Sequence, residues 1–203
     1  MGLLMTMRHF LTSLALVAAL APAAAHAQFS DSYTFLKAVR DADGAKVTQM
    51  VQKPGSGAVI LNTRDNSTGE AALHIVAKRR DTVWLNFILA KGANPDIRDG
   101  NGATPLMLAT QLGWTDGMSL LIERRAQVDL ADGSGETPLI RAVRSRNLAA
   151  VRMLLTAGAN PDRADTASGL SARQQAERDP RAGTILTVIK EAKPKPKAQF
   201  GPN

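Results

Sequence analysis

Apolar and polar positions along this chain repeat at a fixed interval of about 33 residues. Two motifs mark each unit, and they keep the same offset from each other. The first begins with glycine and occupies residues 69–74, 102–107 and 135–140, as in Gly135-Glu-Thr-Pro-Leu-Ile140. The second occupies residues 92–96, 125–129 and 158–162, as in Gly158-Ala-Asn-Pro-Asp162. A shared period in two separate motifs indicates a structural repeat. Such a repeat predicts an extended surface and does not by itself predict a catalytic reaction.

The apolar spacing within a unit predicts two helices. In residues 99–131, Leu106, Ala109 and Leu112 fall on one helical face, and a second apolar segment follows Gly113 at residues 118–122. Thr104 is a suitable N-cap, and the proline after it suits the first helical position, where its missing N–H costs nothing. One helix pair cannot bury such faces alone, so the units are expected to stack.

These residues closely resemble the ankyrin repeat, whose unit has about 33 residues and opens with Thr-Pro-Leu-His. The resemblance covers residues 33–190 and is strongest over 66–165. It implies an all-α ankyrin repeat solenoid of about five helix-turn-helix units, with short β-hairpin or turn connections. It also implies a concave face that binds other proteins, and it implies no catalysis.

The domain boundaries follow from where the repeat weakens. The repeat domain is assigned to residues 28–190, with central units at 66–98, 99–131 and 132–165. Caps are assigned to residues 33–65 and 166–190, since terminal units need a polar outer side. In the last cap the glycine motif, at Gly169, comes one position later than the repeat period places it. Residues 191–203 form a Lys/Pro tail with no apolar pattern, which predicts an extended, disordered chain.

The N-terminal segment has the three parts of a secretory signal peptide. Arg8 precedes an apolar run at residues 10–21, Pro22 interrupts it, and Ala25-His26-Ala27 forms a small-residue cleavage site. The run is short for a membrane span, which takes about 20 residues. We therefore expect residues 1–27 to be removed, with Gln28 as the new N-terminus. Translation could begin at Met1, Met5 or Met7.

Composition and charge then limit the partners. The chain has 25 basic and 18 acidic residues, a formal charge of +7, and no cysteine. Loss of residues 1–27 would remove one basic residue and no acid, leaving +6. Such charge favours anionic partners, but export argues against nucleic acid. The expected partner is another protein with an acidic or mixed polar surface. A weak contact with an anionic envelope surface is an alternative, and we expect a monomer.

His74 is the first candidate for chemistry, because the other histidines, His9 and His26, lie in the signal segment. One histidine cannot form a metal cluster or be oriented by a second one. In the ankyrin family its motif position belongs to a hydrogen-bond network between neighbouring units. No phosphate-binding glycine motif follows a strand. We therefore expect a protein that is not an enzyme, with no catalytic residue, metal or cofactor.

Partner contacts are expected at the positions that vary around the repeated frame. Trp84 occupies a core position of a second helix. Trp114 stands at a junction between helices where ankyrin units usually have a polar residue, as Asp81 and Asn147 are in the neighbouring units, and it fits either packing or an exposed anchor. The candidate contact residues are Glu70, Lys78, Arg79, Asn101, Gln111, Leu112, Trp114, Glu136, Arg141 and Arg144. Replacement of Arg141 and Arg144 by Glu is expected to weaken binding and hardly to alter thermal stability.

Local sequence also predicts that the units at residues 66–98 and 99–131, which are units two and three when the first cap is counted as unit one, are weaker than unit four at residues 132–165. Unit two has Ala71 where its neighbours have a capping threonine, a loss of about 1 kcal/mol. Unit three has Gly117 inside its second helix, which lowers stability by roughly 0.8–1 kcal/mol relative to alanine. It also has Arg125 where other units have glycine. If residue 125 is left-handed, its side chain costs about another 1 kcal/mol. On this basis Gly117→Ala and Arg125→Gly are both expected to stabilise.

Three functions remain open on the sequence. The leading one is a non-catalytic binding module exported to the cell envelope, periplasmic in a Gram-negative bacterium, which binds its partner through the concave face. The second is an envelope-surface adaptor held on anionic surfaces by its basic tail. The third is an intracellular ankyrin regulator, if the signal interpretation is wrong.

Overall fold

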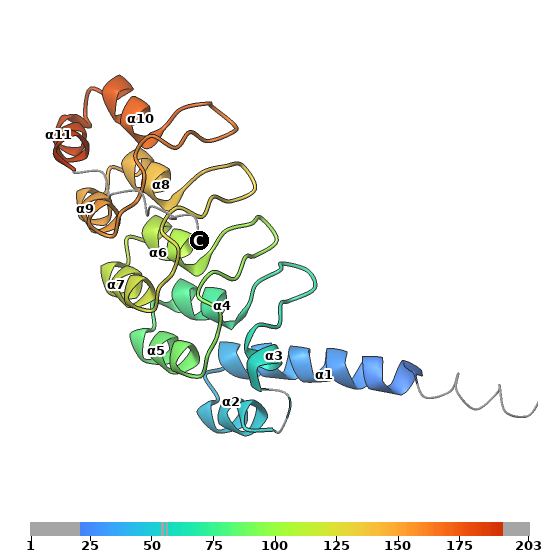
Figure 1. Cartoon of the computed structure of the whole chain (residues 1–203). Coiled ribbons are helices and arrows are strands. Elements are labelled where there is room, and N and C mark those ends of the chain that lie inside the picture. Colours follow the sequence, from blue (N-terminus) through green and yellow to red (C-terminus); the bar gives the residue numbers. More distant parts are fainter. Residues whose placement is uncertain (1–20, 54, 56, 193–203) are drawn as a thin grey trace, which may run out of the picture.

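The structure, a computed structural model, describes residues 21–53, 55 and 57–192. The described residues form eleven helices (Figure 1). In chain order these are α1 (Ala21–Arg40), α2 (Gly44–Val51), α3 (Gly57–Leu61), α4 (Ala72–Arg79), α5 (Thr82–Ala90), α6 (Pro105–Gln111), α7 (Thr115–Glu123), α8 (Pro138–Arg144), α9 (Leu148–Thr156), α10 (Ala172–Arg178) and α11 (Gly183–Glu191).

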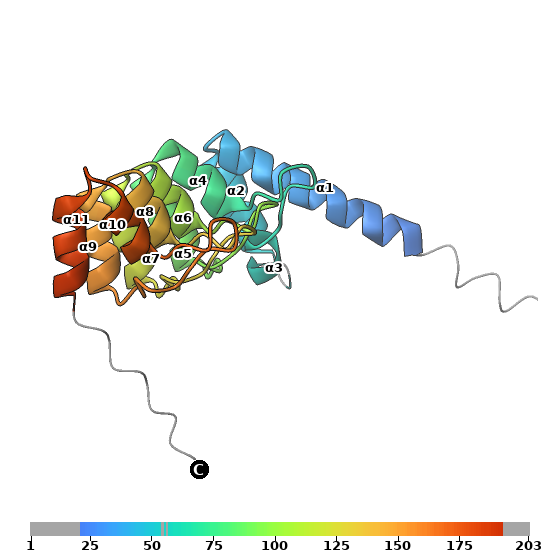
Figure 2. The ribbon, with the colours of Figure 1, turned by 90° about the horizontal axis from the view of Figure 1, so that it is seen from above.

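Ten of these helices form five packed pairs, which we call units one to five: α1/α2, α4/α5, α6/α7, α8/α9 and α10/α11. The first helices contact each other along the stack, and the second helices form a parallel row (Figures 1 and 2). Long hairpins project from the first-helix row to one side. Strand pairing in the described hairpins is limited to two isolated bridges, Arg64–Ala71 and Ala164–Ser171. The predicted all-α solenoid of about five units is confirmed.

Helices α6 and α8 begin where the sequence places capping side chains. Thr104 and Thr137 accept hydrogen bonds from the N–H groups of Met107 and Ile140, at 3.3 and 3.2 Å. Each is followed by a proline at the first helical position. Such caps satisfy backbone donors that a helix start leaves unpaired, and each stabilises its helix by about 1 kcal/mol.

The hairpin tips are joined to one another by backbone hydrogen bonds. The N–H of Gly100 donates to Thr68 at 3.0 Å, and the N–H of Gly133 donates to Asn101 at 2.9 Å. At the last junction Thr166 donates to Ser134 in the same way. A Cβ at residue 100 would lie 2.8 Å from the Thr68 carbonyl oxygen, so this close approach requires glycine.

The one-residue slip in the repeat lies in a hairpin tip. Units three and four turn in four residues, at 99–102 and 132–135, whereas units two and five turn in five, at 65–69 and 165–169. Helix α10 therefore keeps its place in the stack although its sequence motif is shifted. The last two helices form a regular helix pair rather than a degenerate end.

Two of the three expected weak points occur as predicted. Ala71 starts α4 without a side-chain cap. Arg125 follows the end of α7 with φ of 66°, in the left-handed region, where Gly92 and Gly158 have φ of 96° and 93°. A Cβ built at Gly92 meets no atom within 4 Å, so the equivalent strain at Arg125 comes from backbone conformation and not from crowding.

The expectation for Gly117 is wrong, because Trp114 occupies the space beside it. The indole of Trp114 is 7% exposed and packs in the core. A Cβ at residue 117 would lie 2.1 Å from Cε3 of Trp114 and 2.4 Å from Cδ2 and Cζ3. Gly117 therefore makes room for the indole, and Gly117→Ala creates a clash that outweighs its gain in helix propensity.

Helix α1 extends beyond the stack (Figures 1 and 2). Among the described side chains its first core residue is Phe35. The proposed signal segment, residues 1–27, lies mostly outside the described residues, although Ala25 to Ala27 fall within α1. Across the described part of the chain, no helix combines the length and the apolar character needed to cross a membrane.

Candidate functional site

The groove face is defined here as the surface formed by the hairpins and the exposed ends of the first helices. Its most regular feature is a row of long polar side chains, each the last residue of a first helix or one position before its end. These side chains are Lys78, Gln111, Arg144 and Arg178. All four are exposed, and one comes from each of units two to five. The frame residues around them repeat, whereas this row changes from unit to unit.

Two cations of this row are neutralised within their own units. Lys78 pairs with Glu70, and Arg144 pairs with Glu136 at 3.0 Å. In both units the acid follows the hairpin glycine and lies eight positions before the cation. Unit three has Ala103 and Gln111 at these positions, and the glutamine oxygen instead accepts a hydrogen bond from Arg141 at 3.1 Å.

Arg141 belongs to an internal ion network. Its guanidinium lies 2.6 Å from a carboxylate oxygen of Glu136 and 2.9 Å from one of Asp132, and the Arg141 side chain is 19% exposed. Glu136 is itself buried. A glutamate at residue 141 would leave three carboxylates together in a half-buried site, so the expectation of unchanged thermal stability does not hold for Arg141→Glu.

Three of the predicted contact residues serve the stack itself. Arg79 donates to the carbonyl oxygens of Val39 and Arg40, at 2.5 and 3.1 Å, and so ties α4 to the end of α1. Leu112 is half-buried at the end of α6. Trp114 is buried on Gly117, as the packing alternative describes, and so offers no exposed aromatic ring.

The remaining predicted contact residues lie on the groove face or at its rim. Asn101 is exposed at a hairpin tip, and Glu70, Lys78, Gln111, Glu136, Arg141 and Arg144 lie along the groove face. The structure thus brings seven of the ten candidates to one face. Glu136 and Arg141 are engaged inside the protein there, which leaves Asn101, Lys78, Gln111 and Arg144 as the exposed candidates.

His74 is fully buried and connects two units. Its Nδ1 accepts from the N–H of Ala71 at 3.2 Å, so Nε2 carries the proton and donates to the carbonyl oxygen of Ala103 at 3.0 Å. Burial lowers its pKa from the ordinary value of 6.5. This is the structural role that the repeat motif implied. Within residues 21–192 as described, no three His, Asp or Glu side chains are placed to hold a metal ion.

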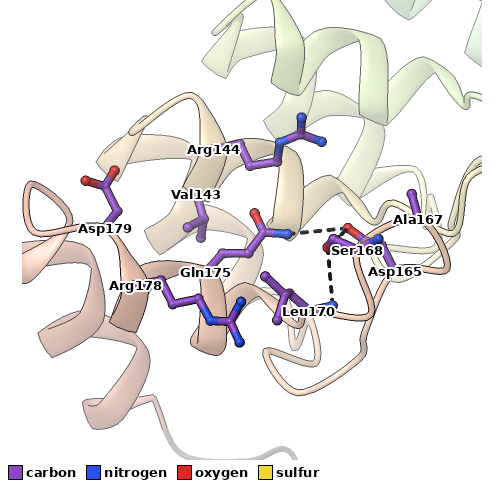
Figure 3. Close-up of a pocket in the computed structure, with 9 residues that line it drawn as sticks. All are labelled: Val143, Arg144, Asp165, Ala167, Ser168, Leu170, Gln175, Arg178 and Asp179. Carbon is purple, nitrogen blue, oxygen red and sulfur yellow. Dashed lines mark hydrogen bonds between the residues drawn. The ribbon is translucent and has the colours of Figure 1, made fainter.

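A cleft of about 550 Å³ opens on the groove face between units four and five (Figure 3). It lies between α8, α10 and the last hairpin. Figure 3 shows Gln175 pointing toward Asp165, with Arg144 and Arg178 on either side of Gln175. Sequence reasoning missed Arg178 and Gln175. The one-position shift of the last motif hides their equivalence to Arg144 and Arg141.

The acidic groups at the cleft are engaged by the protein. Asp165 accepts from the N–H and hydroxyl of Ser168 and from the N–H of Gly169. Burial acts to raise the pKa of Asp165, but these hydrogen bonds and the charge of Arg144 outweigh it, so the pKa is lowered. Asp179 pairs with Arg146 at 2.7 Å. Asp165 therefore stays ionised in the cleft, and Arg178 is the lining cation for which the described residues supply no acid partner.

Comparison with known proteins relates the chain to a repeat family and to a yeast protein. Residues 73–165 match a family described as ankyrin repeats (3 copies). The chain is also 28% identical over 83 residues to oxysterol-binding protein homolog 1 of Saccharomyces cerevisiae. That alignment spans 40% of this chain and 7% of the yeast protein, so no ligand or activity of the whole yeast protein is carried over.

Proposed function

Because residues 73–165 are ankyrin repeats, which generally mediate protein–protein interaction, we propose that this protein is a non-catalytic binding module that holds a partner protein on its groove face. Stacked repeats of this kind present an extended inner surface whose shape is set by the frame. Specificity then resides in the side chains that the frame holds out.

The observation that carries this proposal is the contrast between frame and groove face. Frame residues such as Thr104, Thr137 and His74 use their polar groups for caps and for contacts between units. Across the described residues, no buried side-chain nitrogen or oxygen lacks a hydrogen-bond partner. The exposed row at the ends of the first helices varies instead between lysine, glutamine and arginine. Variation on a fixed, satisfied frame is the arrangement expected of a recognition surface.

We further propose that the module works after export, in the periplasm of a Gram-negative cell. The basic residue, apolar run and small-residue site of residues 1–27 support this, as does the position of the first core residue. Cleavage after Ala27 would leave seven residues before Phe35, so no described core side chain would be lost. The shortened α1 would keep the segment that packs on α2 and α4.

Site-specific photocrosslinking in the native host tests the groove face. A benzoylphenylalanine at Lys78 or Gln111 should give one discrete protein adduct, and the same partner should appear from both positions. Arg152 and Lys190, which are exposed on the second-helix row, provide matched control positions. Adducts from the controls alone would place the interaction on the opposite side and contradict the proposal.

Deletion of residues 191–203 separates this proposal from the tail-adaptor alternative. A module that binds through its groove face keeps its crosslinked partner after the deletion. An adaptor held on an anionic surface by its tail loses its place in the envelope fraction, since such attachment depends on clustered lysines. If the deletion variant stays in the envelope fraction through high-salt washing and gives an unchanged adduct, the result favours the groove-face module over the tail adaptor.

A further inference from the structure

The pairing pattern along the groove face leaves one cation without its acid. In units two and four, the exposed residue at the end of the first helix is a cation, and the residue eight positions earlier is a glutamate that neutralises it. The same offset in unit five joins Arg178 to Leu170. Arg178 is exposed and has no ion-pair or hydrogen-bond partner within the described part of the chain. Leucine thus stands where the other charged units supply a carboxylate.

Arg178 and Leu170 line the same cleft, together with Val143 and Arg144 (Figure 3). The half-buried Leu170 gives the cleft an apolar wall, to which the almost fully buried Val143 adds little surface. Arg144 contributes a second guanidinium, of which one nitrogen contacts Glu136 while the side chain remains 62% exposed. The cleft therefore combines an apolar surface with the unpaired guanidinium of Arg178 and, beside it, the exposed but already paired guanidinium of Arg144.

We propose that this cleft, between units four and five, is an anchoring subsite for an acidic side chain of the partner protein, an Asp or Glu beside an apolar residue. The inference rests on the proposed function and specifies the chemistry of the partner at one point of the groove face. The incoming carboxylate takes the place that Glu70 and Glu136 hold in the other units, and its apolar neighbour covers Leu170.

Charge complementarity and the apolar wall favour an acidic peptide segment over a free inorganic anion. A guanidinium binds a carboxylate through two parallel hydrogen bonds, and such charge-assisted bonds strengthen where water is excluded. An apolar side chain on Leu170 excludes that water, whereas a small anion leaves the wall exposed. Inorganic phosphate should therefore bind this cleft more weakly than a peptide that carries both groups.

The test uses ¹⁵N-labelled protein purified after expression of the full chain, with two capped peptides. One is acetyl-Ser-Leu-Glu-Leu-Ser-amide, and the other replaces its Glu by Gln. In titrations followed by NMR, the Glu peptide should shift the amides around Arg144, Leu170 and Arg178 in a saturable manner. Arg178→Gln should weaken this binding by about tenfold, as expected for the loss of a charge-assisted hydrogen bond. Arg152→Gln on α9 is the matched control and should leave it unchanged.

Leu170→Glu is the second variant, and it restores the acid found in units two and four. It should pair with Arg178, keep the fold and abolish binding of the Glu peptide. Leu170→Gln, which removes the apolar surface without adding charge, should weaken binding less. Amide shifts outside unit five report whether each variant is folded, so loss of binding is not mistaken for unfolding.

Three results would overturn the proposal: no saturable shift at the cleft, equal binding of the Glu and Gln peptides, or binding of phosphate as tight as that of the Glu peptide. None of them contradicts the proposed function, because crosslinks from Lys78 and Gln111 report on the groove face independently. If the peptide binds as expected but Lys78 and Gln111 give no crosslinks, the acidic-peptide site is supported and the proposed function as a partner-binding module is contradicted.

Discussion

Trp114 and Gly117 should behave as a coupled pair, and Gly117→Ala exposes the coupling. Alanine is normally the better helix former by about 1 kcal/mol. Here its Cβ would lie 2.1 Å from the indole of Trp114, well inside van der Waals contact. The indole is buried, so it cannot yield without disturbing the contact between α6 and α7. The substitution should therefore destabilise unit three.

The magnitude follows from two opposing contributions. Overpacking of a filled site costs about 1–3 kcal/mol, against the gain of about 1 kcal/mol in helix propensity. Gly117→Ala should then lower the free energy of unfolding by about 1 kcal/mol. In a Trp114→Asn background the indole is gone, and asparagine can cap α7 as Asn147 caps α9. There the same Gly117→Ala change should stabilise by about 1 kcal/mol, which gives a coupling of about 2 kcal/mol.

A double-mutant cycle measures this coupling. Stacked units open locally, so amide hydrogen exchange within residues 115–123 is the direct assay, and urea unfolding gives the global value. Exchange should quicken in Gly117→Ala alone and slow in the double variant relative to Trp114→Asn. If Gly117→Ala stabilises equally in both backgrounds, the indole does not occupy this space in solution and the reasoning fails.

Four further outcomes are expected. Arg125→Gly should stabilise by about 1 kcal/mol in urea unfolding by removing left-handed strain, and a loss would show that the arginine side chain makes a stabilising contact. Because burial lowers the pKa of His74 in the folded state, the unfolded state takes up the proton first, and stability should fall as pH drops below 6.5. That slope, followed by thermal melts between about pH 7.5 and 5.5, should disappear in His74→Gln. Arg141→Glu should cost about 2–3 kcal/mol by urea unfolding, because it removes the cation held between Glu136 and Asp132 and puts a third carboxylate beside them, whereas Arg141→Lys should cost less. Intact mass of envelope-derived protein should begin at Gln28, and a mass that retains residues 11–27 would contradict export with cleavage.

The fold could be predicted from sequence because its determinants are local and repeat. Thr104 and Thr137 cap helices through their own hydroxyls, and the following prolines fix the first turn. Hydrophobic spacing then defines which faces stack. What escaped prediction depends on contacts between neighbouring segments. The Cβ of an alanine at residue 117 is favourable in any isolated helix, and only the indole packed beside it reverses the sign.

The site was less predictable, since its charges are set by pairs that the sequence separates. Seven of the ten candidates lie on one face, as expected. From the sequence alone, however, the lysine and arginines among them predict an exposed basic surface. In the structure Lys78 and Arg144 are neutralised by acids eight positions away, and Arg141 is held by Glu136 and Asp132. Arg79 is next to Lys78 in sequence, yet it points to the carbonyl oxygens at the end of α1.

The extra residue in the last hairpin explains why the most informative cation was missed. A strictly periodic register aligns Arg144 with Glu177, whereas the structural register aligns it with Arg178, because both arginines end their helices. Only in that register does Leu170 align with Glu70 and Glu136. A repeat protein can therefore be searched for recognition sites by aligning its units in space and looking for the unit that lacks the internal counter-charge of the others. A cation left unpaired by such a break costs little stability when exposed, so folding does not require it there. Its presence at a cleft with an apolar wall is more simply explained by a ligand that supplies the missing carboxylate.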